Sequence, residues 1–241
     1  MQSDAPFSLD FRGVTAGYAG AAVVHDLTLA VRRGERVGLI GRNGAGKTTT
    51  LACAMGLAQL QAGVITLGGQ DVTRMPIHER ARAGLGYVPQ SRDIFPSLTV
   101  EENLVCALQG GSTQRALEQA YTLFPRLHER RKNGGGQLSG GEQQMLSVAR
   151  ALVGSPKILL LDEPLEGLAP RVREELMEAI EQLALTTGVG CLLVEQHVDV
   201  VLDFAHQVVV LERGLIVFSG SSDRLRNEPA LLNRAIGLEK V

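Results

Sequence analysis

The sequence contains no tryptophan, and aromatic residues make up only 4% of its 241 residues. It also lacks an excess of basic residues, since the formal net charge is −2 and the isoelectric point is about 6.2. Nucleic-acid binding depends on a basic surface, so this balance argues against DNA or RNA as a partner. No apolar run approaches the roughly 20 residues of a membrane helix, and residues 1–11 do not read as a leader. We therefore expect a cytoplasmic chain that does not itself cross a membrane.

Cysteines are also few: Cys53, Cys106 and Cys191 are widely spaced, without a CxxC pair or a neighbouring histidine cluster. This spacing argues against a zinc site and against a disulfide framework. We expect three reduced, mostly buried thiols that behave as small apolar residues. A hydrophobic content of 44% is enough for one large domain, or for a core with a smaller inserted subdomain.

What the sequence does contain is a glycine-rich stretch, GRNGAGKT, between the apolar run 37–40 and the segment KTTTLACAMGL. The order of strand, tight loop and helix matches the P-loop pattern G-x-x-x-x-G-K-[ST]. Its glycines let backbone N–H groups converge on phosphate, and the helix N-terminus adds a positive end. Lys47 is expected to reach the β- and γ-phosphates, and Thr48 to hold Mg²⁺. The expected nucleotide-binding residues are Gly41, Arg42, Asn43, Gly44, Ala45, Gly46, Lys47, Thr48 and Thr49.

Two carboxylates follow the apolar run 158–161, which reads as a buried parallel strand. They emerge at the strand's carboxyl end, where the P-loop also opens. Asp162 suits Mg²⁺ binding through water, and Glu163 suits activation of the water that attacks the γ-phosphate. Two further predicted strands end near the same edge. Gln90 follows the first of these, and Gln196 and His197 follow the second, where a side chain is placed to hydrogen-bond the γ-phosphate.

The segment LSGGEQQ predicts a second anion site. Ser139 and Glu142 form a capping box, which leaves the N–H groups of Gly140 and Gly141 facing outward. Two adjacent glycines cost roughly 1 kcal/mol each against alanine, and capping does not require them. We therefore expect a ligand to approach the backbone closely here.

The predicted fold is α/β, with a P-loop NTPase (RecA-like) core at about 1–90 and 154–220 that includes an N-terminal antiparallel β subdomain. An inserted α-helical subdomain is expected at about 91–153, where Thr99 is a good N-cap, and a tail helix at 221–241. Alternation over residues 27–31 predicts a half-exposed antiparallel strand. Tyr18, an isolated aromatic residue upstream of the P-loop, is a candidate either for packing or for stacking on a base.

The P-loop, the strand-end glutamine, LSGGEQQ within a helical insertion and LLLDEP together resemble the ATPase subunit of ABC transporters. The resemblance covers nearly the whole chain and implies that two subunits sandwich two ATP molecules head to tail. It also implies that Tyr18 stacks on adenine and that Gln90 couples Mg²⁺ to the membrane subunit. Each nucleotide then lies between the P-loop of one subunit and a second set of residues from the other: Ser139, Gly140, Gly141 and Gln143.

Narrower similarities favour two related groups. The segments FPRLHERR, LDEPLEGLAP and LLVEQH are similar to the ATPases of branched-chain amino-acid importers and of urea importers. Such importers combine two different ATPase subunits, two permease subunits and a periplasmic binding protein, and this chain resembles the second, shorter ATPase. The run SRDIFPSLTVEENL favours the urea type and GEQQMLSVARAL the amino-acid type, so both stay open. The resemblance implies a peripheral location on the cytoplasmic side of the inner membrane.

The chain departs from the broader family pattern at two positions. The usual switch histidine aligns with Gln196, and His197 falls one position late. A neutral amide can hydrogen-bond the γ-phosphate but does not titrate near neutral pH. The aspartate usual after LDEP aligns with Ala169. We expect an asymmetric dimer with a different second ATPase to compensate.

Two other functions compete with transport. One is a soluble ABC ATPase that serves cofactor assembly or another non-transport complex, and only its partner distinguishes it. The other is a nucleotide-binding module without turnover, which requires Glu163 to be idle. The sequence does not identify the transported solute, because the ATPase subunit does not contact that solute.

Overall fold

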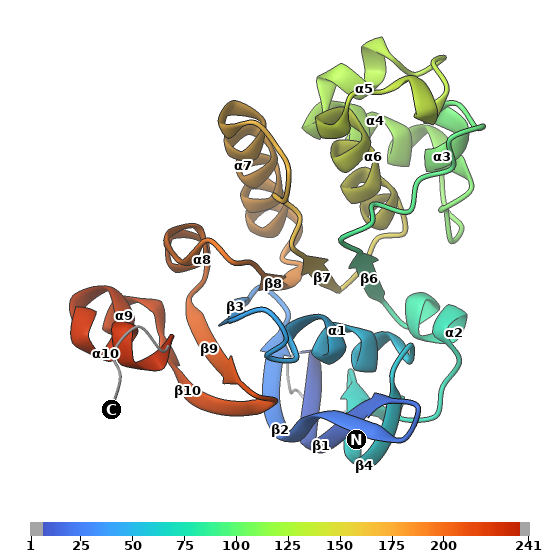
Figure 1. The fold of residues 1–241 in the computed structure, drawn as a ribbon. Helices are drawn as coiled ribbons and strands as arrows, with labels where there is room; N and C mark the ends of the chain where they lie inside the picture. Colours follow the sequence, from blue (N-terminus) through green and yellow to red (C-terminus); the bar gives the residue numbers. More distant parts are fainter. Residues whose placement is uncertain (1–6, 237–241) are drawn as a thin grey trace.

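The computed structural model describes residues 7–236 and contains two β-sheets with helices around them (Figure 1). The first sheet is antiparallel with strand order β2-β1-β4-β5. Its strands are β1 (Ser8–Tyr18), β2 (Ala21–Arg32), β4 (Gln59–Leu67) and β5 (Gln70–Asp71). The first two strands are long, and β1 stays continuous because register shifts between Phe11 and Gly17 absorb its irregularity. The predicted half-exposed strand over 27–31 lies in β2, where buried and more exposed residues alternate.

The second sheet has six strands in the order β10-β9-β3-β8-β7-β6. The five strands from β9 to β6 are parallel, and β10 pairs antiparallel with β9 at the edge. Because the strands are parallel, their carboxyl ends meet at one edge, which is where ligands bind in open α/β sheets. The bounds are β3 (Arg36–Gly41), β6 (Leu85–Val88), β7 (Ile158–Asp162), β8 (Gly190–Val194), β9 (Gln207–Glu212) and β10 (Leu215–Ser221).

Two hydrophobic cores lie on opposite faces of this second sheet. One joins the antiparallel sheet and α1 to residues such as Leu39 and Leu160, and the other packs α6 and α7 against residues such as Leu159 and Leu161. The alternation of Leu159, Leu160 and Leu161 between the two cores explains why this strand has no polar residue before Asp162. Helices of this part are α1 (Lys47–Met55), α2 (Ile77–Arg82), α7 (Pro170–Thr187), α8 (Val198–Phe204), α9 (Ser222–Asn227) and α10 (Pro229–Ala235).

The chain between β6 and β7 is helical, as predicted. It contains α3 (Val100–Val105), α4 (Thr113–Leu123), α5 (Pro125–Glu129), a 3₁₀ turn at Gly135–Gln137 and α6 (Gly140–Val153), gathered on one side of the molecule in Figure 1. Thr99 caps α3 through a complete capping box, as expected. Helix formation is interrupted at Phe124, because Pro125 starts a new helix and disfavours a helical residue before it.

The predicted tail helix is two short helices, α9 and α10, and residues 237–241 of that prediction lie outside the described residues. Within residues 7–236, none of the helices is both long enough and apolar enough to cross a membrane.

Candidate nucleotide-binding site

The P-loop connects β3 to α1, as the sequence predicts. Gly46 is the N-cap of α1 with φ 105°, a backbone conformation that favours glycine. A Cβ there would lie 2.7 Å from Val24 Cγ1, so a side chain would also lack room. No side chain caps α1, which leaves the first N–H groups of this helix available to an anion. Lys47 is only 5% exposed and donates from Nζ to the Gly41 carbonyl at 2.9 Å.

Thr48 and Asp162 meet at the carboxyl edge of the sheet. Thr48 Oγ1 donates to Asp162 Oδ1 at 3.1 Å, and the Tyr87 hydroxyl donates to Asp162 Oδ2 at 3.2 Å. Burial raises the pKa of the Asp162 carboxyl, and these two hydrogen bonds oppose that shift. A hydroxyl and a carboxylate are hard oxygen donors of the kind that Mg²⁺ prefers, so the pair fits the metal that the sequence predicts.

Glu163 lies beside the P-loop lysine. Its Oε1 is 3.5 Å from Lys47 Nζ, and its Oε2 accepts a 2.6 Å hydrogen bond from Gln196 Nε2. The backbone of Glu163 has φ 46°, a left-handed conformation that costs a non-glycine residue about 1–2 kcal/mol. Backbone strain of this kind is common at functional sites, where it fixes the direction of a side chain.

A pocket of about 300 Å³ joins these groups. It contains nine of the residues predicted to bind ATP or Mg²⁺ or to act in hydrolysis: Asn43, Gly44, Gly46, Lys47, Thr48, Thr49, Gln90, Glu163 and Gln196. Three of the predicted P-loop residues do not line it: Gly41 at the end of β3, Arg42, which is exposed to solvent, and Ala45, which is buried.

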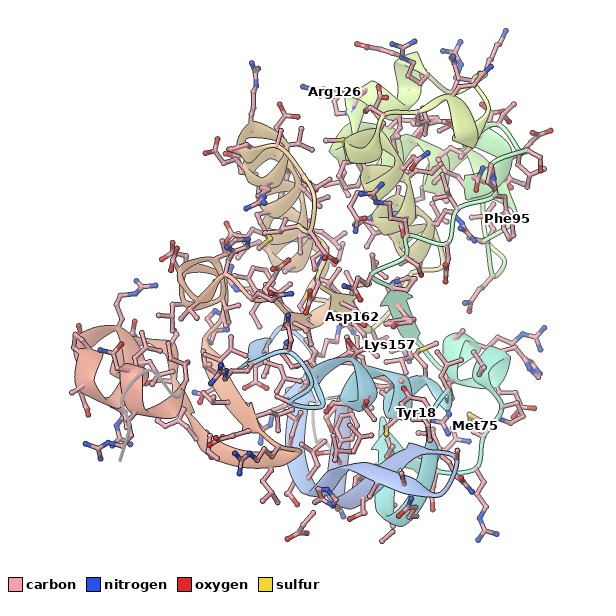
Figure 2. All side chains as sticks on the ribbon, in the orientation of Figure 1. Tyr18, Met75, Phe95, Arg126, Lys157 and Asp162 are labelled. Carbon is pink, nitrogen blue, oxygen red and sulfur yellow. The ribbon has the colours of Figure 1, made fainter. Side chains whose placement is uncertain are left out.

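For three predicted residues the structure gives contacts or positions that the sequence did not specify. His197 does not line the pocket, since its Nε2 lies 3.1 Å from Arg173 Nη1, so the structure assigns the position beside Glu163 to Gln196 instead. Gln90 lines the pocket, as its strand-end position predicts, and its side-chain amide donates to Glu166 Oε2 at 2.6 Å. Tyr18 is the last residue of β1 in the antiparallel sheet and is 46% exposed. Figure 2 labels it on that sheet, away from Asp162 at the centre of the molecule.

The second predicted anion site lies on α6, outside this pocket. Ser139 is its N-cap, and both hydrogen bonds of the predicted capping box are present. Packing gives Gly141 a second reason to be glycine, because a Cβ there would lie 2.7 Å from Val172 Cγ1 on α7, and the approach of a ligand stays a prediction. At Gly140 a Cβ would meet Arg92 Nη1 at 3.2 Å. Gln143 accepts a 3.4 Å hydrogen bond from the same Arg92 nitrogen.

Three residues that the sequence patterns did not indicate contact the predicted ones. Tyr87 lies on β6, the strand beside β7, and its hydroxyl reaches Asp162. In the sequence, only its position three residues before Gln90 points to this contact. Glu195 is 2% exposed directly after the buried strand β8, and a carboxylate next to five buried residues is itself unusual. Arg92 joins the loop after Gln90 to α6, with Nε 3.2 Å from Gln144 Oε1.

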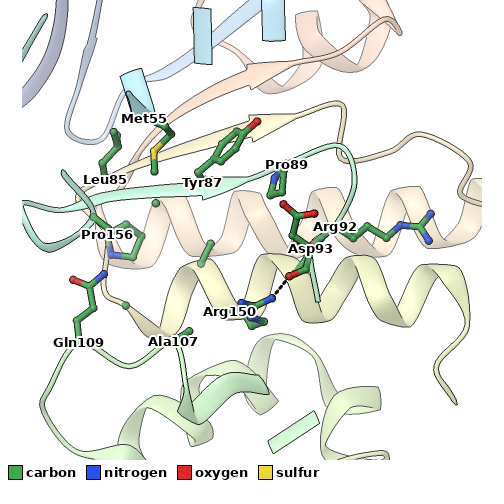
Figure 3. A pocket seen from close by; sticks show the side chains of 15 residues that line it. Met55, Leu85, Tyr87, Pro89, Arg92, Asp93, Ala107, Gln109, Arg150 and Pro156 are labelled. Atoms are coloured by element: carbon green, nitrogen blue, oxygen red, sulfur yellow. Dashed lines mark hydrogen bonds between the residues drawn. The ribbon is translucent and has the colours of Figure 1, made fainter. Parts of the chain in front are cut away.

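A second pocket, of about 290 Å³, lies between β6, the loop after Gln90 and α6 (Figure 3). Arg150 from α6 donates to the carbonyl of Asp93, and its guanidinium carbon lies 4.5 Å from the ring centroid of Phe95. Phe95 is 45% exposed, which leaves an apolar side chain at this surface. The pocket therefore has charged residues in its wall, and an exposed aromatic ring lies against one of them, Arg150.

Known proteins resemble this chain over nearly its whole length. The ABC transporter family matches residues 24–166. The high-affinity branched-chain amino acid transport ATP-binding protein BraG of Pseudomonas aeruginosa is 40% identical, covering 95% of this chain and 99% of BraG. The lipopolysaccharide export system ATP-binding protein LptB of Haemophilus influenzae is 36% identical, covering 91% of this chain and 93% of LptB. A solved ATP-binding subunit of an ABC transporter superposes with a TM-score of 0.83 at 28% identity, covering 94% of this chain and 97% of that one.

These similarities agree with the site built above. The family match begins in β2, runs through the P-loop and ends just after Asp162 and Glu163, so it includes the residues that meet at the carboxyl edge of the sheet. The fold predicted from the sequence is confirmed by the structural similarity. The chain therefore belongs to the ABC transporter ATP-binding family, whose members are ATPases.

Proposed function

We propose that this chain hydrolyses ATP to drive an importer of branched-chain amino acids or of a related small polar solute such as urea. The observation that carries the general mechanism is the contact of Lys47, Glu163 and Gln196 in one pocket. The identity of 40% to BraG over nearly the full length of both proteins supports the amino-acid solute. The urea solute rests on the sequence resemblance alone.

ATP binding is assigned to the P-loop pocket. The free N–H groups at the start of α1 and the buried ammonium of Lys47 supply donors for the β- and γ-phosphates. Tyr18 offers an exposed ring for adenine stacking, a contact of about 1–3 kcal/mol per base by analogy with single-stranded nucleic acids. Bound Mg²⁺ would neutralise developing charge on the phosphates, held by Thr48 and Asp162, with Gln90 nearby.

Hydrolysis is assigned to Glu163. Its carboxylate is 7% exposed and borders the same pocket as the P-loop, so it is placed to orient a water and accept its proton. Gln196 donates to that carboxylate and keeps one oxygen in a fixed direction. Because an amide stays neutral, this contact is independent of pH in the range where a histidine would titrate.

The second anion site is assigned to a partner's nucleotide. Ser139, Gly140, Gly141 and Gln143 lie outside the P-loop pocket of their own chain. We propose that they close over ATP bound to a second, different ATPase subunit. That partner would supply the carboxylate that Ala169 replaces here.

The pocket of Figure 3 is the proposed docking place for a permease segment at the cytoplasmic side of the membrane. Asp93 and Arg150 line this pocket and offer polar contacts. Phe95 lies against Arg150 beside the pocket and offers apolar contact. Because Arg92 ties this loop to α6, a permease that moves the loop also moves Ser139. A periplasmic binding protein would contribute only through the permease.

The first experiment tests the mechanism with Glu163→Gln. We expect ATP binding to remain while turnover falls about 10²–10⁴-fold, because the base is removed without a change of shape. Glu212→Gln, an exposed change at the end of β9, is the control and should behave like the original chain. Normal turnover in Glu163→Gln would contradict the assignment.

The second experiment tests the partner. The tagged chain is purified from its own membranes in mild detergent, and the co-purifying proteins are identified by mass spectrometry. Recovery of two permeases and a second ATPase is the expected result. Recovery of lipopolysaccharide export components would replace import by the LptB-type activity, and recovery of only soluble proteins would leave ATP hydrolysis but overturn transport.

A further inference from the structure

Glu195 is a buried carboxylate that the mechanism above does not use. Its side chain is 2% exposed, and none of the ion pairs among residues 7–236 includes it. Burying a carboxylate is costly unless hydrogen bonds replace its hydration. Two backbone N–H groups do so: Leu165 donates to Oε1 at 2.9 Å and Gln196 donates to Oε2 at 3.2 Å. Burial raises the pKa of Glu195, and these two hydrogen bonds oppose the shift.

Both donors belong to segments that carry the residues assigned to hydrolysis. Leu165 lies two residues after Glu163, and Gln196 donates through its side chain to Glu163 Oε2 at 2.6 Å. The contacts therefore close a ring that runs from Glu163 along the chain to Leu165, across to Glu195, on to Gln196, and back to Glu163. Loss of one of these contacts would leave the position of Gln196 relative to Glu163 less restrained.

The ring also bears on the backbone of Glu163. Its left-handed φ of 46° persists only if neighbouring contacts hold it. On the side of β8, the Glu163 N–H donates to the Val194 carbonyl at 2.9 Å. On the other side, the turn after Glu163 is held by the hydrogen bond that the Leu165 N–H donates to Glu195 Oε1. Glu195 is thus the side chain that ties the strained turn to the strand end beside it.

We propose that Glu195 is a positioning residue for ATP hydrolysis, which holds the loop after Glu163 and the Gln196 side chain in one arrangement. The proposal rests on the proposed role of Glu163.

The test is Glu195→Gln in the full chain. The amide has the same shape, but its oxygen accepts from only one N–H while its NH₂ group faces the other donor. We expect kcat to fall about 10- to 100-fold, as for a misplacement of a catalytic group, with KM for ATP within about twofold. Hydrogen exchange at the amides of Leu165 and Gln196 should become faster. Glu212→Gln, also at the end of a strand but exposed, should change none of these quantities.

A coupling measurement separates positioning from general stability. If Glu195 acts through Gln196, the Glu195→Gln change should cost less in a Gln196→Ala background than in the original chain. Additive losses, an unchanged kcat, or a parallel loss of ATP binding and turnover would each overturn the proposal. If Glu195→Gln does not fold, Glu195→Asp keeps the charge one methylene shorter and is judged by the same readouts.

Glu163→Gln is measured in parallel. Normal turnover in that variant would defeat the proposed role of Glu163, and with it the basis of this inference. Inactive Glu163→Gln together with fully active Glu195→Gln would defeat the role of Glu195 alone.

Discussion

The side-chain amide of Gln196 lies 2.6 Å from the Glu163 carboxylate, although the two residues are 33 positions apart in the sequence. The contact exists because β7 and β8 are neighbouring parallel strands that end level with each other, with Asp162 opposite Val194. Glu163 and Gln196 therefore leave the same edge of the sheet. This relationship gives the amide, rather than the adjacent imidazole, direct access to the proposed base.

The first prediction concerns this contact. Gln196→Ala removes the donor and should lower kcat for ATP hydrolysis about 10- to 100-fold, less than removal of the base itself. Gln196→Glu keeps the shape but brings a second carboxylate to the first, so it should lower kcat further at neutral pH. His197→Ala should stay within about twofold, because His197 contacts Arg173 outside the pocket. A larger loss in His197→Ala than in Gln196→Ala would reverse the assignment.

The sequence could predict the edge of the sheet but not the side chains that meet there. A P-loop, an apolar run and a strand-end glutamine are local patterns, and each was found where expected. Whether Gln196 or His197 faces Glu163 depends on where the chain turns after Val194, which adjacent residues in a sequence do not reveal. The need for glycine at position 141 comes from Val172 on another helix, which only the packing of α6 against α7 shows.

The second prediction concerns Tyr87, whose hydroxyl donates to Asp162. Tyr87→Phe removes that hydrogen bond and leaves the buried carboxylate less well oriented. Loss of such an outer contact to a metal ligand typically costs about 10- to 100-fold in metal affinity. We expect the Mg²⁺ concentration for half-maximal ATP binding to rise by about that factor, as measured by nucleotide fluorescence.

Tyr18→Phe is the matched control, because it also loses one hydroxyl but keeps the ring proposed for adenine stacking. Its Mg²⁺ dependence should equal that of the original chain. Equal Mg²⁺ dependence in both variants would show that the Tyr87 hydroxyl does not orient Asp162.

The third prediction concerns Arg80, which is 3% exposed and donates only to backbone carbonyls. Its guanidinium reaches the end of α1 and the segment before α2, through the carbonyls of Cys53, Ala54, Thr73 and Met75. Arg80→Lys leaves a single ammonium that cannot serve all four. The free energy of unfolding should fall by about 2–4 kcal/mol, because buried acceptors lose their donors.

The readout for Arg80→Lys is thermal denaturation. For a chain of this size the expected loss corresponds to a midpoint lower by roughly 4–16 °C. Arg82→Lys, on the same helix but exposed, should leave the midpoint nearly unchanged. Equal midpoints for the two variants would mean that the four carbonyls find other donors.

The fourth prediction concerns the thiols. Cys53 and Cys191 are buried, as expected from the sequence, whereas Cys106 is exposed. Burial raises the pKa of both buried thiols from 9.0 to about 12. At pH 8, N-ethylmaleimide should therefore modify Cys106 alone, and Cys106→Ser should react only after denaturation in urea. A second thiol that reacts as fast as Cys106 in the native chain would contradict the buried positions.

The same pKa shifts predict a fall in stability at alkaline pH. Above pH 9 the thiols of the unfolded chain ionise, while those of the native chain keep their protons until about pH 12. Because the native state then binds more protons, the free energy of unfolding decreases as pH rises, by up to about 1.4 kcal/mol per pH unit for each thiol. Urea denaturation between pH 8 and 11 measures this slope. Replacing exposed Cys106 by serine is the control and should leave the slope unchanged, since this thiol is not buried in the native chain.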